Sequence, residues 1–192
     1  MLKSEVLSIL SQKISDCTLC EELTDDRKAW GYHTVPGEGA PNARLMIIGE
    51  SPGKDEAEQG KPFVGPSGRL LNKIIQAAGW KREDIFIANI LKCRPPNNRD
   101  PLPLEAANCR RFLDIQIRCV DPEAILCLGR IACLYLLGRS PESRMASLRG
   151  IHDYQGRMVV CSFHPSYLLR NPPAKADLWE DIQPLIEKLA AK

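Results

Sequence analysis

Three polar residues stand at matching places in the chain, each at the end of a short apolar run. They are Glu50, Asn89 and His164. The runs are typical of buried strands, and open α/β sheets bind their ligands at the carboxyl ends of the strands. We therefore expect a carboxylate, an amide and an imidazole to share one crevice. Such groups can orient water, read the edge of a polar ring and donate to a developing anion.

The loop after the first run adds a rigid backbone and an aromatic ring. Gly49-Glu50-Ser51-Pro52-Gly53 is too rich in glycine and proline to continue a strand or a helix. Pro62-Phe63-Val64-Gly65 follows and offers Phe63 on a short turn. Together with Glu50, these segments predict a pocket for a flat polar ligand.

The cysteines fall into two groups. Cys17 and Cys20 form a chelating pair, and Cys93 and Cys109 flank loop-like sequence. Four thiolates from separate segments can bind zinc or an iron–sulfur cluster, and the spacing leaves the metal open because structural zinc sites usually show two such pairs. Disulfides are not expected in a chain of cytosolic character. The other four are interpreted as small buried hydrophobes: Cys119, Cys127, Cys133 and Cys161.

Strand and helix patterns alternate along the chain. Strands are predicted at 44–49, 85–91, 124–128 and 157–162. Helices are predicted at about 3–14, 67–78, 103–118, 130–137 and 175–190. The stretch from the first helix to Asn42 is interpreted as irregular. This alternation indicates βαβ units, so we expect one three-layer α/β domain over residues 1–192, with a central, mainly parallel four-stranded sheet flanked by helices.

Composition narrows the class of protein. The chain has 192 residues, of which 44% are hydrophobic and 26% are charged, as in ordinary globular domains. No apolar stretch is long enough to span a bilayer, so we expect a cytoplasmic protein without membrane contact. The net charge of +2 neither demands nor excludes nucleic acid, because a small basic footprint can occupy one face.

Several segments together resemble the motifs of family 4 uracil-DNA glycosylases. They are residues 49–53 with 60–65, 89–96 and 164–170. Ser51 stands where that family often has alanine. The cysteines are similar in order and context to the family's 4Fe–4S ligands. The resemblance therefore implies a 4Fe–4S cluster on Cys17, Cys20, Cys93 and Cys109, within a region formed by residues 17–20 and 93–109.

The resemblance also implies an activity. The chain would hydrolyse the N-glycosidic bond of uracil in DNA, releasing uracil and leaving an abasic site, as a monofunctional enzyme. Glu50 would orient water toward the sugar, and His164 would donate to uracil O2. Phe63 would stack on the flipped base, and Asn89 would read its edge beside Gly49 and Ser51.

Contacts to DNA are expected around the pocket. Ser166 and Arg170 would contact phosphates. Leu168 would wedge into the space that the flipped base leaves, with simple helix or core packing as the alternative. A further phosphate-contacting rim is predicted at Lys92, Arg94 and Arg99, with a solvated basic loop as the alternative. We expect a monomer that acts on single- or double-stranded uracil-containing DNA. Two competing hypotheses are a non-catalytic DNA-binding protein and an iron–sulfur electron carrier.

Overall fold

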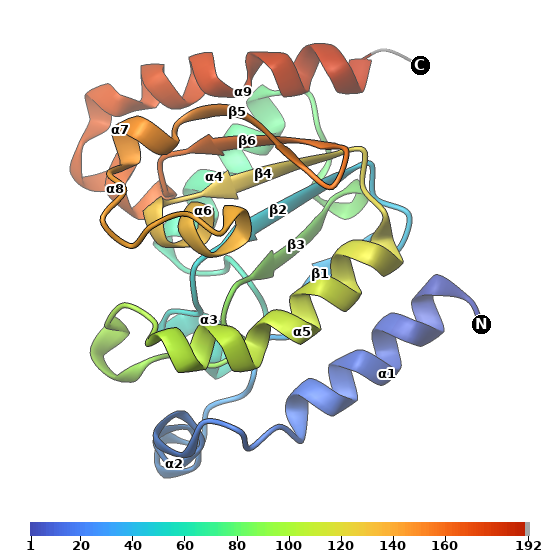
Figure 1. Ribbon diagram of the computed structural model, residues 1–192, viewed down its shortest axis with the longest axis vertical. Helices are drawn as coiled ribbons and strands as arrows, with labels where there is room; N and C mark the ends of the chain where they lie inside the picture. The colour runs from blue at the N-terminus through green and yellow to red at the C-terminus, as the bar shows by residue number, and fades with distance from the viewer. Residues whose placement is uncertain (191–192) are drawn as a thin grey trace.

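A six-stranded sheet lies between two layers of helices in the computed structural model, which describes residues 1–190 (Figure 1). The strands are β1 (Glu38–Gly39), β2 (Leu45–Gly49), β3 (Phe86–Asn89), β4 (Ala124–Leu128), β5 (Gly150–Tyr154) and β6 (Arg157–Ser162). The α-helices are α1 (Lys3–Ser15), α2 (Glu21–Trp30), α3 (Lys54–Gln59), α4 (Pro66–Ala77), α5 (Pro103–Val120), α6 (Arg130–Leu137), α7 (Met145–Leu148), α8 (Pro165–Arg170) and α9 (Lys175–Ala190). Three short 3₁₀ turns are η1 (Arg82–Asp84), η2 (Pro96–Asn98) and η3 (Pro172–Ala174).

The sheet has the strand order β1-β3-β2-β4-β6-β5. The four inner strands run parallel, and they are the four that the apolar runs predict. The expectation of only four strands is wrong, because β1 and β5 add antiparallel edges. Both edge strands lack a continuous apolar run: β1 has two residues, and β5 alternates between half-buried and exposed positions. Edge strands are covered on fewer sides, so their sequence signal is weaker.

Alternate residues of the inner strands supply two separate cores. On β2, Leu45 and Ile47 face the side covered by α4 and α9. Met46 and Ile48 face the side covered by α5 and α6. Because both faces are covered, every residue of β2 is buried, and the predicted three-layer α/β arrangement is confirmed. The parallel direction of the four inner strands brings their carboxyl ends to one edge of the sheet (Figure 1).

The N-terminal part contains two helices, of which the sequence patterns predict α1 but not α2. Helix α1 packs along α5 through Leu10, Ile14 and Phe112. The stretch after it is not irregular throughout, because α2 occupies ten of its residues. That helix is strongly polar and buries only Leu23 and Thr24, so no apolar stripe marks it in the sequence. None of the described helices is long and apolar enough to cross a membrane.

Candidate active site

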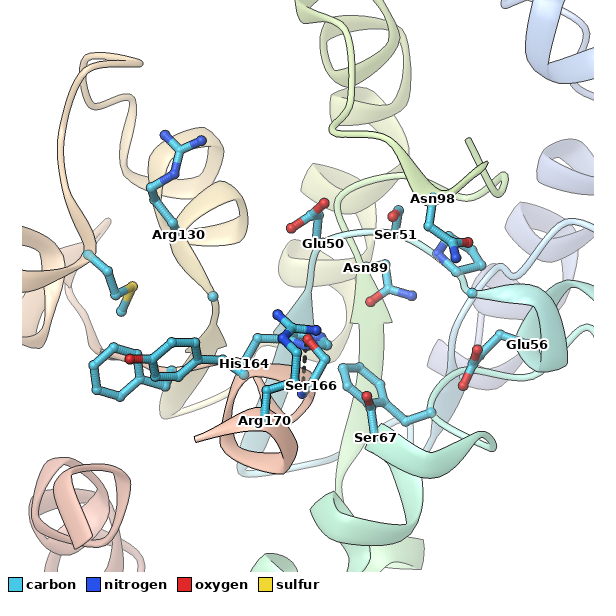
Figure 2. A pocket seen from close by; sticks show the side chains of 17 residues that line it. Glu50, Ser51, Glu56, Ser67, Asn89, Asn98, Arg130, His164, Ser166 and Arg170 are labelled. Carbon is cyan, nitrogen blue, oxygen red and sulfur yellow. Dashed lines mark hydrogen bonds between the residues drawn. The ribbon is translucent and has the colours of Figure 1, made fainter. Parts of the chain in front are cut away.

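The carboxyl edge of the sheet holds a cavity of about 640 Å³. Glu50 follows β2, Asn89 ends β3 and His164 follows β6, and all three line this cavity (Figure 2). Ser51, Phe63, Ser166 and Arg170 line it too. The structure therefore brings together the side chains that the strand ends predict. A volume of this size suits a small ligand such as a single nucleoside.

Gly49 leaves room for the side chains of Asn89 and Phe63 to approach the end of β2. It pairs with Asn89 in the β2–β3 register. A Cβ at this position would lie 2.4 Å from Asn89 Oδ1 and 2.7 Å from Phe63 Cζ, so any other residue would push the amide and the ring apart. Asn89 is buried, and no described group donates a hydrogen bond to its Oδ1. A buried acceptor without a partner is costly, which suits an atom that pairs with a ligand.

Phe63 is held in a strained turn. Its φ is 52°, in the left-handed region that non-glycine residues rarely adopt. Glu56 Oε1 fixes the turn by accepting from the backbone N–H groups of Val64 at 3.0 Å and Gly65 at 2.9 Å. Gly68 permits the close approach, since a Cβ there would lie 1.9 Å from the Phe63 carbonyl oxygen. Strain of this kind is typical of ligand sites, and here it sets the ring against the cavity.

His164 is oriented by its own helix. Its Nδ1 accepts from the backbone N–H of Ser166 at 3.2 Å and lies 2.8 Å from Ser166 Oγ. Withdrawal from water, reinforced by Arg170, lowers the pKa of His164 to about 4, so the ring is neutral at pH 7. With Nδ1 accepting, the proton of the neutral ring resides on Nε2. The imidazole therefore offers one N–H donor, and its ring centroid lies 5.7 Å from that of Phe63.

Glu50 is largely withdrawn from water. Burial, with a smaller contribution from Asp100, raises the pKa of its carboxyl group to about 7, while Arg130 acts in the opposite direction. A carboxyl group that titrates near neutral pH suits general-base chemistry.

Arg130 is a site residue that the sequence analysis misses. It begins α6 directly after β4, lines the cavity and donates from Nη2 to Asp100 Oδ2 at 3.4 Å. Glu50 and His164 are singled out because they are polar residues that follow apolar strand runs. The same criterion selects Arg130, because Gly129-Arg130 also follows an inner strand. Gly129 lies close to His164: a Cβ there would be 3.0 Å from the histidine Cβ.

The assignment of Leu168 as a wedge is wrong. Leu168 is fully buried in the core beneath α4 and α9, and a wedge must reach DNA. Its neighbour Leu169 is 45% exposed on the outer face of α8. Ser166 is engaged by His164, whereas Arg170 is exposed at the mouth of the cavity.

The predicted basic rim is wrong at two of its three positions. Lys92 is buried and donates from Nζ to the Asn89 carbonyl oxygen and to Gln116 Oε1, both at 2.8 Å. Arg99 is paired with Glu105 and Glu22. Only Arg94 keeps part of its side chain at the surface with no carboxylate partner among the described residues. The rim interpretation fails because the local sequence shows neither the burial of Lys92 nor the ion pairs of Arg99.

Four cysteines line a second, smaller cavity between the N-terminal helices and α5. They are Cys17, Cys20, Cys93 and Cys109, and all are free thiols. Burial raises the pKa of Cys93 to about 12 and also raises the pKa values of Cys20 and Cys109. Such thiols become thiolates only beside a cation, and an all-sulfur donor set is the set that zinc and iron–sulfur clusters use. The donor set therefore fits a thiolate-bound metal centre.

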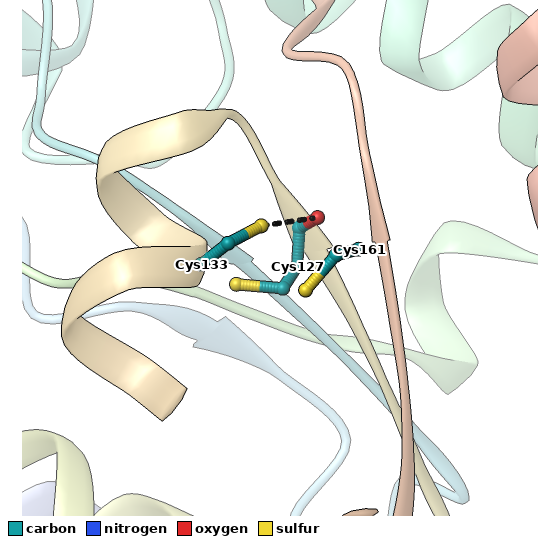
Figure 3. Close-up of side chains that lie close together, drawn as sticks. All are labelled: Cys127, Cys133 and Cys161. Carbon is teal, nitrogen blue, oxygen red and sulfur yellow. Dashed lines mark hydrogen bonds between the residues drawn. The ribbon is translucent and has the colours of Figure 1, made fainter. Parts of the chain in front are cut away.

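A different set of three cysteines lies in the sheet core. The sulfur atoms of Cys127, Cys133 and Cys161 lie within 4.8 Å of one another, and all three residues are fully buried (Figure 3). Cys133 Sγ donates to the Cys127 carbonyl oxygen at 3.6 Å. These three are packed among apolar side chains, as the sequence predicts. Cys119 differs, because it is only partly buried at the end of α5.

Comparison with known proteins places the chain in a family. The Uracil DNA glycosylase superfamily matches residues 36–183. The type-4 uracil-DNA glycosylase of Thermotoga maritima is 40% identical over 171 residues, covering 88% of this chain and 86% of the relative. That of Saccharolobus solfataricus is 38% identical over 198 residues, covering 97% and 88%. A type-5 uracil-DNA glycosylase of Pyrobaculum aerophilum is 28% identical over 183 residues, covering 81% and 80%. This chain therefore belongs to the uracil-DNA glycosylase superfamily and to its type-4 family.

Proposed function

We propose that the chain hydrolyses the N-glycosidic bond between uracil and deoxyribose in DNA, releasing uracil and leaving an abasic site. The observation that carries the proposal is the convergence of Glu50, Phe63, Asn89 and His164 on one cavity in a chain of this superfamily. No lysine lines that cavity among the described residues, so the structure offers no amine for Schiff-base chemistry. The activity is accordingly that of a monofunctional glycosylase.

The pocket selects uracil through its edge and its face. The target nucleotide leaves the base stack before it reaches the site. Its ring then lies against Phe63, whose turn is fixed by Glu56. The Asn89 side chain pairs with the N3–H and O4 of uracil, and its Oδ1 gains the donor that no described residue supplies. Cytosine carries an amino group at that edge, so the pairing would be mismatched, at about 1–3 kcal/mol for each unmade bond.

His164 stabilises the departing base. Cleavage leaves negative charge on uracil and positive charge on the sugar. The neutral imidazole holds its proton on Nε2 because Ser166 occupies Nδ1, so it donates to uracil O2 as charge develops there. Backbone N–H groups of the loop from Gly49 to Gly53, which includes Ser51, supply further donors.

Glu50 acts on the sugar side. In its ionised form it orients a water molecule toward C1′ and offsets the positive charge on the sugar. Arg130 and Asp100 tune its ionisation in opposite directions.

The DNA backbone contacts the mouth of the cavity. Arg170 is exposed there and supplies a phosphate contact, and Arg130 lines the other side. Ser166, which lies 2.8 Å from His164 Nδ1 through its hydroxyl and lines the cavity, supplies a second phosphate contact. Leu169, which is exposed where Leu168 is buried, inserts into the space that the flipped base leaves.

The four cysteines that line the smaller cavity hold a 4Fe–4S cluster in this proposal. Its support is the set of four converging thiols and the presence of one chelating pair rather than two. When bound, the cluster joins residues 17–20 to residues 93–109 and so secures the loop that follows Asn89. Its role is structural, within one domain that spans residues 1–192 and works as a cytoplasmic monomer on single- or double-stranded DNA.

The test is an oligonucleotide with one uracil, incubated with the metal-loaded protein and then treated with alkali, which cuts at abasic sites. We expect cleavage at the uracil position only after alkali. A matched oligonucleotide with thymine should remain intact. Intact uracil oligonucleotide would refute the proposal, and cleavage before alkali would refute the monofunctional assignment.

A further inference from the structure

A continuous row of side chains leads from the uracil pocket to the end of α2. Asn98 lines the pocket, and its Oδ1 accepts from Arg94 Nε at 2.8 Å. Arg94 Nη1 donates to the hydroxyl oxygen of Tyr32 at 3.2 Å, and the guanidinium carbon lies 5.4 Å from the Tyr32 ring centroid. The Tyr32 ring stacks on Trp30 with a centroid distance of 6.3 Å and an interplanar angle of 18°. We call Trp30, Tyr32, Arg94 and Asn98 the aromatic track.

The outer end of the track is open to solvent. Trp30 is 69% exposed, so only a small part of its ring is covered by the fold. It is the last residue of α2, and Gly31 with φ of 67° turns the chain so that Tyr32 returns beside it. An exposed tryptophan stacked on a tyrosine does little for the core. Exposed aromatic surface is instead typical of binding sites.

The inner end of the track adopts an unusual backbone conformation beside the pocket. Asn97 and Asn98 both have positive φ, 54° and 53°, directly after Pro95 and Pro96. Two adjacent residues in this region are strained, and such strain collects at ligand sites. Among the described residues, no carboxylate pairs with Arg94, so the track carries a positive charge beside its rings.

We propose that the aromatic track binds the DNA strand that flanks the uracil, with a base stacked on Trp30 and Tyr32 and a phosphate facing Arg94. This rests on the proposed function, because the flipped uracil fixes one end of the strand at Asn98. Aromatic rings accept any base face, and an adjacent arginine neutralises the backbone, so the contact is independent of sequence. A base in a duplex is already stacked. The track therefore favours single-stranded or frayed DNA beside the uracil.

The experiment measures how affinity depends on the length of the DNA. Single-stranded oligonucleotides carry one 2′-fluoro-2′-deoxyuridine, whose fluorine opposes positive charge on the sugar and so slows cleavage. They are extended by thymidines on the 5′ or the 3′ side, and binding to the metal-loaded protein is followed by fluorescence anisotropy. Wild type should bind more tightly as one of the two sides is extended. Trp30→Ala should lose that gain, so its Kd for the longest oligonucleotide should be about five- to ten-fold higher than that of wild type.

Trp179→Ala is the matched control. Trp179 is also exposed, at 41%, but it lies on α9, at the opposite end of the molecule from α2 in the view of Figure 1. It should keep the wild-type length dependence and the quenching of tryptophan fluorescence that DNA causes, whereas Trp30→Ala should lose most of that quenching. The inference is overturned if wild type gains nothing from extension, or if Trp30→Ala gains as much as wild type.

Failure of the proposed function would look different. Wild type would then release no uracil from the shortest deoxyuridine oligonucleotide, whatever the length dependence of binding. Uracil release without any gain from extension would contradict the aromatic track and leave the glycosylase in place.

Discussion

The uracil pocket and the four-cysteine cavity are built in opposite ways. The pocket takes its groups from the ends of parallel strands, so the sheet sets their positions before any ligand arrives. The cysteine cavity takes its thiols from α5 and from the segments next to α2 and after β3, which no sheet joins. Asn89 Oδ1 is already in position and has no hydrogen-bond donor among the described residues. The cysteine segments, in contrast, need a bound metal to link them. The fold therefore preorganises the pocket, and in our proposal a bound metal organises the other cavity.

Lys92 connects the two regions. It lines the cysteine cavity, and its Nζ donates to the carbonyl oxygen of Asn89, the residue that we propose pairs with uracil. Gln116 shares the ammonium and donates from Nε2 to the Pro36 carbonyl oxygen at 2.7 Å. The buried ammonium, through these two acceptors, ties the end of β3 to α5. Substitutions in the pocket should therefore reduce catalysis, and substitutions of the cysteines should reduce stability. Substitution of Lys92 should reduce both.

The largest effect is expected from the pocket itself. His164→Ala removes the donor to uracil O2, and Glu50→Gln removes the charge that offsets the sugar. Each should lower the single-turnover rate of uracil release by about 10²–10³-fold, as loss of a preorganised donor or charge does elsewhere. The metal content and visible absorption of both variants should match wild type. A rate within about three-fold of wild type would contradict the assigned roles.

The second effect separates the cysteine groups. Cys93→Ser should lower the metal content per chain. It should also lower the midpoint of thermal unfolding by about 10 °C, because a bound metal contributes several kcal/mol of stability and the loss of each kcal/mol lowers the midpoint by about 2–4 °C in a protein of this size. Cys119→Ser, a partly exposed cysteine outside both groups, is the control and should behave like wild type. The ligand assignment would be wrong if Cys93→Ser retained full metal content, or if substitution of Cys127, Cys133 or Cys161 removed the metal.

Lys92→Met is expected to show the mixed phenotype. The substitution keeps the length of the side chain but leaves two buried acceptors unpaired, at a cost of about 1–3 kcal/mol. Unfolding should shift by that amount, and the Kd for free uracil should rise by about ten-fold as Asn89 loses its support. Lys73→Met, on the exposed side of α4, is the control. Loss of stability with an unchanged Kd would show that Lys92 serves the cysteine region alone.

The last effect is a pH dependence that should belong to the pocket alone. Burial raises the pKa of Glu50 to about 7. In the proposed mechanism the ionised form of Glu50 is the active one. The value of kcat/KM should therefore fall as pH decreases below 7, approaching ten-fold for each unit. His164, with a pKa near 4, stays neutral over this range and adds no second step above about pH 5. Glu50→Gln should flatten the profile, and an unchanged slope in that variant would assign the titration to another group.

The sequence predicts the parts of the molecule that obey simple local rules. Glu50, Asn89 and His164 follow apolar runs, and parallel strands end at one edge, so their convergence follows from the fold. Leu168 and Leu169 show the limit of such rules. A helix of six residues is too short to reveal its buried face by periodicity, so the sequence does not show that Leu168 is buried and Leu169 exposed.

Long-range partners account for most of the remaining misses. Lys92 is buried against the general preference of lysine, and its side-chain acceptor Gln116 lies 24 residues away. Trp30 meets Arg94 only through Tyr32, which no local pattern signals. Helix α2 was missed because its stability comes from packing a few residues against the cysteine region rather than from an apolar stripe.

The most direct test of the central claim is a crystal structure of the protein with free uracil. The pocket as described predicts the uracil ring against Phe63, its N3–H and O4 on the Asn89 side chain, and its O2 within hydrogen-bonding distance of His164 Nε2. This arrangement should form without movement of β2 or β3, because the sheet already sets it. Uracil bound elsewhere, or bound here without contacts to Asn89 and His164, would contradict the account.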